Sequence, residues 1–193
     1  MSTKPKETKH KSKLKAILGF VLAFSIPFTA ITVSNELLLK NYIVPSASME
    51  TTLMTNDRIF ATIIHGEWEP QRGKIVIFKD TENWLEKNDT EYLVKRVIGL
   101  PGDTISCCTE DGKLLVNGEP YNEEYIIDGS NMAFEEQTVP EGYLFMLGDN
   151  REFSADSRYH INEGTQFVPI SSVESIVAFR YWPLSNFGNI PNE

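Results

Sequence analysis

The chain has 193 residues, enough for one globular domain with additional segments. Its net charge of −9 is unevenly distributed, because residues 1–15 carry six lysines and one glutamate, which leaves −14 for the remainder. A body of that charge repels phosphates, and no basic patch interleaved with aromatic residues is present, so nucleic acid is excluded as a partner. The basic arm and the acidic body are predicted to lie in different surroundings.

An uncharged segment follows the arm and runs from Ala16 to Asn35. As a helix it would span roughly 30 Å, about the thickness of the hydrocarbon core of a bilayer. The alternative is a cleaved secretory signal, which has a shorter apolar run of roughly 7–15 residues and a small-residue cleavage site. We favour an uncleaved transmembrane helix at 16–35. Because lysine-rich segments stay in the cytoplasm, residues 1–15 are predicted to be cytoplasmic and 36–193 extracytoplasmic.

The body consists of short segments rich in β-branched and aromatic residues, bounded by turn residues. No long segment with a 3.6-residue period follows residue 40, so we predict a mostly β, antiparallel domain. Segments 80–90 and 119–140 are polar and resemble loops, and a small insert is expected at about 104–147. The predicted strands are 58–64, 74–78, 91–99, 103–107, 113–118, 143–147 and 175–182.

The two cysteines, Cys107 and Cys108, are adjacent in the sequence. An ordinary disulfide needs a Cα separation of about 4.4–6.8 Å, whereas consecutive Cα atoms are about 3.8 Å apart. Three alternatives stay open, namely a strained vicinal bridge, two free thiols, or a bond to another chain. A zinc site would need a second cysteine pair, and the sequence has none.

The three histidines form no metal-binding pair of the kind found in metal hydrolases, and no phosphate-binding glycine loop is present. A serine nucleophile without an obvious histidine base directs attention to lysine. In the predicted strand 91–99, alternation places Leu93, Lys95 and Val97 on one face. Burial between aliphatic neighbours would lower the pKa of Lys95, and a neutral amine can act as a general base. The alternative is a lysine that extends its ammonium group to water from a half-exposed strand.

Two further segments contain polar groups suited to chemistry. Ser48 follows closely on the predicted membrane helix, although a serine in this context also commonly caps a helix or makes local hydrogen bonds. Residues 147–158, with the sequence LGDNREFSADSR, are dense in side chains of both signs beside the apolar run YLFML. This composition indicates an organised loop packed on the core, whereas the alternative is a solvated loop with a surface ion pair.

Four segments, PSASMETTL, KIVIFK, EYLVKRVIGLPGD and LGDNREFSADSR, follow the apolar segment in that order. In this arrangement the chain resembles bacterial type I signal peptidase, the membrane-bound Ser/Lys protease that removes signal peptides from exported preproteins. The resemblance covers almost the whole chain from the anchor onward. Its size and single anchor are similar to those of the compact Gram-positive form.

The resemblance implies a role for each residue that matches a family motif. Ser48 matches the nucleophile and Lys95 the general base, while the Ser46 hydroxyl and the Ser48 N–H match the oxyanion hole. Ser154 matches the serine that hydrogen-bonds to the lysine and orients it. The other matched positions are a supporting set and apolar pockets for small substrate side chains: Asp156, Arg158, Asp149, Asn150 and Arg151 in the former, and Met49, Leu93 and Val94 in the latter.

Three positions depart from the family pattern. Thr51 stands where proline is usual, Lys74 where an aspartate is common, and Ala47 where a glycine is common between the two serines. None of these changes removes a reacting group, so an active enzyme is expected. The substitution at Thr51 is the one that would loosen the turn after the nucleophile.

The implied function is endopeptidase cleavage of preproteins with Ala-x-Ala signal peptides at the outer face of the cell membrane. The implied partners are these preproteins and the lipid bilayer, with no metal and no cofactor. Three alternative functions are compatible with parts of the sequence. They are a self-processing Ser/Lys protease of the repressor type, a membrane-tethered β-rich receptor without catalysis, and a hydrolase based on His65 or His160.

Overall fold

The computed structural model describes Val21 and residues 39–85, 91–126 and 132–190. The chain divides after Leu39 into two units, and the fold described below belongs to the second unit, Lys40–Glu193. The predicted arm and, apart from Val21, the predicted membrane helix lie outside the described residues. Within the described parts of the chain, no helix has the length and apolar character needed to cross a membrane.

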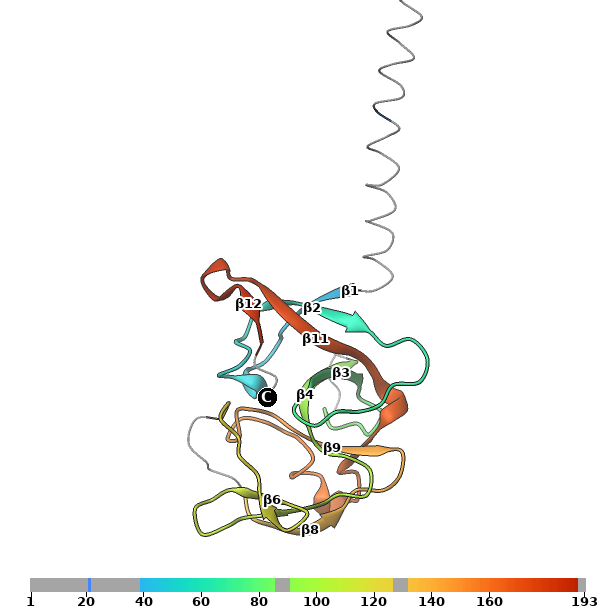
Figure 1. Ribbon diagram of the computed structural model, residues 1–193, viewed down its shortest axis with the longest axis vertical. Coiled ribbons are helices and arrows are strands. Elements are labelled where there is room, and N and C mark those ends of the chain that lie inside the picture. The colour runs from blue at the N-terminus through green and yellow to red at the C-terminus, as the bar shows by residue number, and fades with distance from the viewer. Residues whose placement is uncertain (1–20, 22–38, 86–90, 127–131, 191–193) are drawn as a thin grey trace, which may run out of the picture. The chain divides into compact units, whose positions relative to one another are not determined.

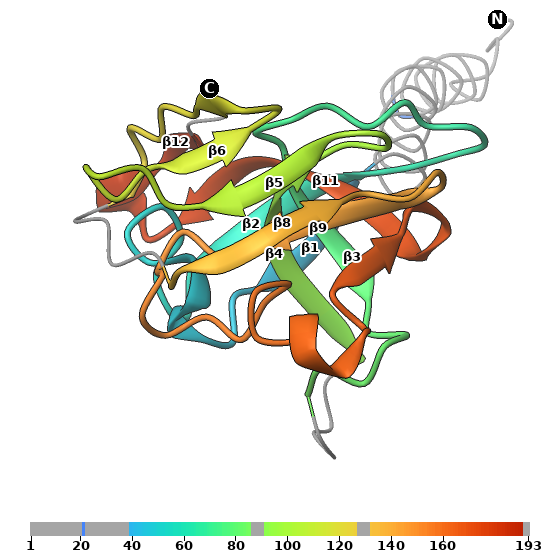
Figure 2. The same cartoon turned by 90° about the horizontal axis from the view of Figure 1, so that it is seen from below.

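The described residues form two β-sheets (Figures 1 and 2). The larger has the strand order β1-β2-β11-β3-β4-β9-β10, and β12 also pairs with β11. The pairs from β2 to β10 along this order are antiparallel. Its strands are β1 (Leu39–Ile43), β2 (Arg58–Ile63), β3 (Ile75–Lys79), β4 (Tyr92–Gly99), β9 (Tyr143–Leu147), β10 (Phe167–Pro169), β11 (Val173–Trp182) and β12 (Gly188–Asn189).

The smaller sheet has the order β7-β6-β5-β8 and is antiparallel throughout. Its strands are β5 (Thr104–Cys107), β6 (Leu114–Val116), β7 (Glu119–Pro120) and β8 (Phe134–Thr138). The described residues also contain four short 3₁₀ helices: η1 (Ala47–Met49), η2 (Ile161–Glu163), η3 (Ile170–Ser172) and η4 (Leu184–Asn186). The prediction of a mostly β, antiparallel fold is confirmed.

The prediction that 119–140 is a loop was wrong for β7 and β8. Their sequences, EP and FEEQT, are polar and mostly exposed, so they lack the apolar alternation that marks a strand. They pair through backbone hydrogen bonds, and the turn between β6 and β7 has positive φ at Asn117 and Gly118, as a tight hairpin requires. The smaller sheet ends at Thr138, and β9 belongs to the large sheet, in contrast to the expected insert limit near 147.

The central strands β3 and β4 are buried on both faces, which explains their nearly continuous apolar sequences. Ile75 and Ile77 pack into one cluster with Met49, Leu53 and Ile59. The alternate residues Val76 and Phe78 pack into another cluster with Leu93, Val97 and Met146, among others. Polar side chains on either face of β4 are therefore also withdrawn from water.

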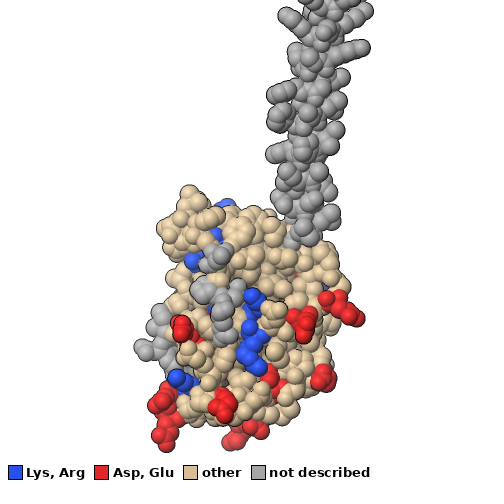
Figure 3. All heavy atoms as spheres, in the orientation of Figure 1, with Lys and Arg blue, Asp and Glu red and all other residues tan. Residues whose placement is uncertain are grey.

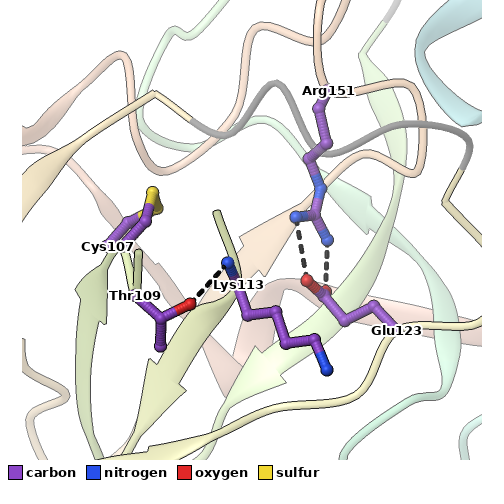
Figure 4. The surroundings of a disulfide bond; sticks show 6 residues. Cys107, Thr109, Lys113, Glu123 and Arg151 are labelled. Atoms are coloured by element: carbon purple, nitrogen blue, oxygen red, sulfur yellow. Dashed lines mark hydrogen bonds and ion pairs between the residues drawn. A yellow bond between two sulfur atoms is a disulfide. The ribbon is translucent and has the colours of Figure 1, made fainter. Parts of the chain in front are cut away.

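The adjacent cysteines form a vicinal disulfide at the end of β5, with Cα atoms 3.0 Å apart (Figure 4). The strained bridge is thus the alternative that the structure contains. In the turn that follows, Thr109 Oγ1 accepts a hydrogen bond of 3.0 Å from the backbone N–H of Lys113. The face in Figure 3 carries scattered acidic side chains with a small group of Lys and Arg between them.

Candidate active site

A cavity of about 380 Å³ brings together residues from well-separated parts of the chain. Ser46, Ser48 and Met49 come from the turn around η1, and Leu93, Val94 and Lys95 come from β4. Phe153 and Ala155 come from the loop that follows β9. The predicted nucleophile, base, oxyanion hydroxyl and substrate pockets therefore line one cavity.

The segment that carries Ser48 is held by the loop after β9. The backbone N–H of Asn150 donates to the Ser48 carbonyl at 3.1 Å. The Asn150 side chain donates to the Ala47 carbonyl at 3.0 Å, across 103 positions of sequence. Ser48 itself is 8% exposed, and Ser46 Oγ donates to Ser48 Oγ at 3.4 Å. The two serine hydroxyls are thus neighbours on a turn that Asn150 fixes in place.

Lys95 lies on β4 with only 2% of its surface exposed. Burial lowers its pKa from 10.5 to about 8, while the charges of Asp156 and Asp149 act to raise the pKa and that of Arg158 to lower it. Among the described residues, none forms an ion pair with the Lys95 ammonium or a hydrogen bond that joins it to Ser48 or Ser154. The alternative of a lysine extended to solvent is wrong, because Lys95 is almost completely buried.

Asp156 and Arg158 form a fully buried bidentate ion pair, with N–O distances of 2.8 and 2.9 Å. Asp156 also accepts the backbone N–H of Gly148 at 3.0 Å. Burial alone would raise the pKa of Asp156, but Arg158 and the Gly148 N–H outweigh it and lower the pKa. Asp156 is therefore a carboxylate that holds the start of the 148–158 loop against β9.

Arg96, the residue after Lys95, is also fully buried and is paired on the opposite face of β4. Its guanidinium donates to both oxygens of Asp149, at 2.8 and 2.6 Å, and to the Gly73 carbonyl at 2.6 Å. Asp149 thus anchors the loop after β9 to β4. Sequence reasoning placed Asp149 in the supporting set but assigned no role to Arg96, since nothing in their spacing indicates that they pair.

Ser154 does not make the hydrogen bond that the resemblance implies. Its Oγ is buried and has no hydrogen-bond partner among the described residues, so the expected bond to Lys95 is not formed. The side chain packs against the Cα of Gly148, where an added Cβ would overlap both Ser154 Oγ and the Ser48 carbonyl. Gly148 is a site residue that sequence reasoning missed, although it lies inside the quoted LGDNREFSADSR motif.

The two histidines of the body are not among the residues lining this cavity. His160 stacks on Trp84 and hydrogen-bonds to Glu163 at 2.8 Å, and His65 is exposed. A larger cavity, of about 670 Å³, lies beside the vicinal disulfide and is lined by Arg158 but by none of the predicted catalytic residues. The geometry favours a serine–lysine site over the histidine-based alternative.

Comparison with known proteins identifies the family of the chain. The family described as "Signal peptidase, peptidase S26" matches residues 17–182, and the chain belongs to this family. A signal peptidase I of Leptolyngbya laminosa is 35% identical over 150 residues, covering 76% of this chain and 70% of that protein. A probable signal peptidase I-2 of Synechocystis sp. is 36% identical over 151 residues, covering 78% of this chain and 66% of that protein.

A crystal structure of a signal peptidase I from Enterococcus faecalis also matches, with a TM-score of 0.46 and 32% identity. The match covers 57% of this chain and 98% of that chain. Other relatives are longer, since the chain spans 44% of a probable thylakoidal processing peptidase 2 of Arabidopsis thaliana.

Proposed function

We propose that this chain is a serine endopeptidase that cleaves signal peptides from preproteins, with Ser48 as nucleophile and Lys95 as general base. The observation that carries the proposal is the burial of Lys95, whose pKa is lowered to about 8, on the wall of the cavity that also contains Ser46 and Ser48. A fraction of such amines is neutral near pH 7, and only the neutral form accepts a proton. Membership of the signal peptidase family supplies the substrate class.

The reaction is acyl transfer in two steps. Neutral Lys95 takes the Ser48 proton as Ser48 Oγ attacks the carbonyl carbon of the scissile peptide bond. Lys95 then gives this proton to the leaving amine as the C–N bond breaks, which leaves an acyl-serine. A water molecule, deprotonated by Lys95, attacks the ester and releases the acyl chain, and Ser48 recovers its proton. The short serine–lysine hydrogen bond that this needs forms when substrate is bound, since such bonds are often long in free enzymes.

The oxyanion of each tetrahedral intermediate is stabilised by the Ser48 N–H and the Ser46 hydroxyl. In the free protein the Ser46 hydroxyl points to Ser48 Oγ, and it turns to the oxyanion when the intermediate forms. One such donor is typically worth about 10²–10³ in rate. Met49, Leu93 and Val94 line the same cavity and would accept small side chains, as in the Ala-x-Ala sites of signal peptides.

We further propose that residues 1–15 are cytoplasmic, that 16–35 span the membrane and that 36–193 work at its outer face. The lysine arm and the length of the apolar segment support this arrangement. The end of β11 and the residues that follow it expose three large apolar side chains, Trp182, Leu184 and Phe187, by 48%, 70% and 63%. Exposed apolar and aromatic side chains of this kind suit a domain that works against the membrane interface.

The test is cleavage of a preprotein with an Ala-x-Ala site by the full chain in lipid vesicles. Wild type, Ser48→Ala and Lys95→Met are compared, with folding checked by circular dichroism. Processing at the predicted bond by the wild type alone is the expected result, with kcat/KM rising with pH through about 8 as Lys95 becomes neutral. Equal cleavage by the folded variants, or a rate that stays constant from about pH 6 to 9, contradicts the mechanism.

If the folded wild type does not cleave the preprotein, the tethered receptor is the better description of the chain. Binding of the same preprotein without cleavage, measured with and without the signal peptide, would then identify it. The self-processing alternative makes a different prediction, namely a cut within this chain, which mass spectrometry of the purified protein detects.

A further inference from the structure

Two side chains in the segment between β7 and β8 contact elements that carry the candidate site. Glu123 and Tyr125, here called the clamp pair, follow β7 in sequence. Tyr125 donates its hydroxyl to Glu123 Oε1 at 2.9 Å, so the two side chains form one unit. Between them, Glu124 is exposed and accepts a hydrogen bond from Asn122 at 3.3 Å. Glu123 and Tyr125 contact residues of the large sheet and of the loop after β9, whereas Glu124 is exposed.

Glu123 contacts the loop after β9. Its carboxylate accepts Arg151 Nη1 at 3.1 Å and also accepts Arg151 Nη2, and the two side chains are only 3% and 2% exposed (Figure 4). Arg151 Nε donates in turn to the Gly148 carbonyl at 3.0 Å. Burial alone would lower the pKa of Arg151, but the hydrogen bond and charge of Glu123 outweigh it and raise the pKa. Glu123 is therefore the counter-charge of the arginine that braces Gly148.

Tyr125 contacts the two other parts of the chain that carry the site. Its ring lies 3.8 Å from the Arg96 guanidinium, on the strand of Lys95. Its backbone carbonyl accepts a hydrogen bond of 3.2 Å from Thr51 Oγ1, three positions after Ser48. Thr51 stands where proline is usual in the motif that the chain resembles. A proline at this position would restrict the φ angle of the turn. In this chain the hydrogen bond from Thr51 to Tyr125 can restrain the turn instead.

We propose that the clamp pair positions the nucleophile turn, β4 and the loop after β9 relative to one another, with Glu123 as a positioning residue for the reaction. The inference rests on the proposed serine–lysine mechanism. Catalysis requires the serine, the lysine and the oxyanion donors to keep a fixed geometry, and a displacement of about 1 Å can cost on the order of 10² in rate. A single paired unit that touches all three elements is placed to hold that geometry.

The first experiment compares Glu123→Gln with Glu124→Gln in the full chain, using vesicles and the Ala-x-Ala preprotein. Both changes remove one negative charge, but only the first removes a buried acceptor. We expect Glu123→Gln to lower kcat by about tenfold or more with KM nearly unchanged, and Glu124→Gln to match the wild type. The midpoint of the rise of kcat with pH should also move upward for Glu123→Gln, because a loosened site admits water to Lys95.

The second experiment uses Thr51, whose change is small enough to preserve folding. Thr51→Val removes the hydroxyl and keeps the shape, whereas Thr51→Ser keeps the hydroxyl. We expect a loss of kcat of about two- to tenfold for valine and recovery with serine. Thermal unfolding of every variant is measured alongside, since a residue that serves stability alone would change the unfolding temperature and leave the pH midpoint of kcat in place.

The positioning role is overturned if the wild type cleaves and Glu123→Gln shows the kcat and pH midpoint of Glu124→Gln. It is equally overturned if Thr51→Val and Thr51→Ser have the same kcat. Failure of the proposed function gives a different result, because the wild type would then leave the preprotein uncut.

Discussion

The two faces of β4 hold buried cations in opposite ways. Arg96 is 0% exposed and has a bidentate carboxylate, a carbonyl and an aromatic ring around its guanidinium. Lys95, one position earlier, is 2% exposed, and none of the described residues forms an ion pair with it. This difference shows that the effect of burial on a charged side chain depends on the partners it has. Burial lowers the pKa of Lys95, which has no direct partner, whereas the partners of Arg96 offset the cost of burying its charge.

The same contrast separates stability from reactivity. The paired face of β4 joins the strand to the loop after β9 through Asp149, and so holds the fold together. The unpaired face places an amine with a lowered pKa in the cavity with Ser48. A site that needs a neutral lysine has to leave that lysine without the carboxylate that would best stabilise its charge.

The largest effect is expected from Lys95→Met on catalysis. Methionine keeps the length and apolar contacts of the stem but has no amine to accept a proton. Cleavage of the preprotein should fall by at least about 10³-fold, as when the base of a hydrolytic serine is removed. Single-turnover cleavage assays measure it, and a folded Lys95→Met protein that cleaves at the wild-type rate would remove Lys95 from the mechanism.

The next largest effect is expected on stability, from a change at the face of β4 that carries Arg96. Asp149→Asn leaves the Arg96 guanidinium buried with a neutral partner, which should lower the free energy of unfolding by about 3–5 kcal/mol. Urea unfolding followed by tryptophan fluorescence measures the change. Asp111→Asn, an exposed carboxylate in the turn after β5, serves as the control and should stay within about 0.5 kcal/mol of the wild type. If both variants are equally stable, the pairing of Arg96 is not what stabilises this face.

Lys95→Met should have the reverse effect on stability. With a pKa of 10.5 when unfolded and about 8 when folded, the unfolded chain binds more protons between these values, so wild-type stability rises with pH there. At pH 7 the charged lysine costs about 3 kcal/mol, and Lys95→Met should be more stable by about that amount. The difference should shrink as the pH rises above about 8. A Lys95→Met protein that is less stable at pH 7 would contradict the unpaired state of Lys95.

The smallest effect is expected from Gly148→Ala, at the start of the loop after β9. The added methyl group would overlap Ser154 and the Ser48 carbonyl, so the nucleophile segment has to move. We expect the free energy of unfolding to fall by about 1–3 kcal/mol. We also expect kcat to fall, because the segment that carries Ser48 is displaced. Unchanged kinetics would show that the backbone around Ser48 yields without cost.

Much of the large sheet could be predicted from sequence, because its central strands are apolar on both faces. β3, β4, β9 and β11 coincide with predicted strands to within two residues. β7 and β8 were not predicted as strands, because their residues are mostly polar and exposed. Only pairing with a neighbouring strand makes their backbone regular. The membrane helix at 16–35 stays a prediction.

Within the site, strand alternation between two aliphatic neighbours left both a buried and a solvent-extended Lys95 open, and the structure shows that it is buried. The placement of Ser46, Ser48, Met49, Leu93 and Val94 around one cavity agrees with the resemblance, whereas their roles stay predictions. The pairing of Arg96 with Asp149 and of Glu123 with Arg151 joins residues 53 and 28 positions apart, and no local pattern encodes such contacts. The hydrogen bond expected from Ser154 is not formed, and the contact of Ser154 with Gly148 is one that only the folded backbone defines.

The register of β4 against β3 has a genetic consequence. Val76 lies opposite Lys95, and Ile75 lies opposite Arg96, in an uninterrupted run that ends at Tyr92. A strand that slips by one position exchanges its two faces completely. An in-frame insertion or deletion of one codon between Tyr92 and Lys95 that shifts this register would therefore send the arginine into the cavity and the lysine to Asp149. Such an allele would keep every reactive residue in its sequence and still lose the enzyme.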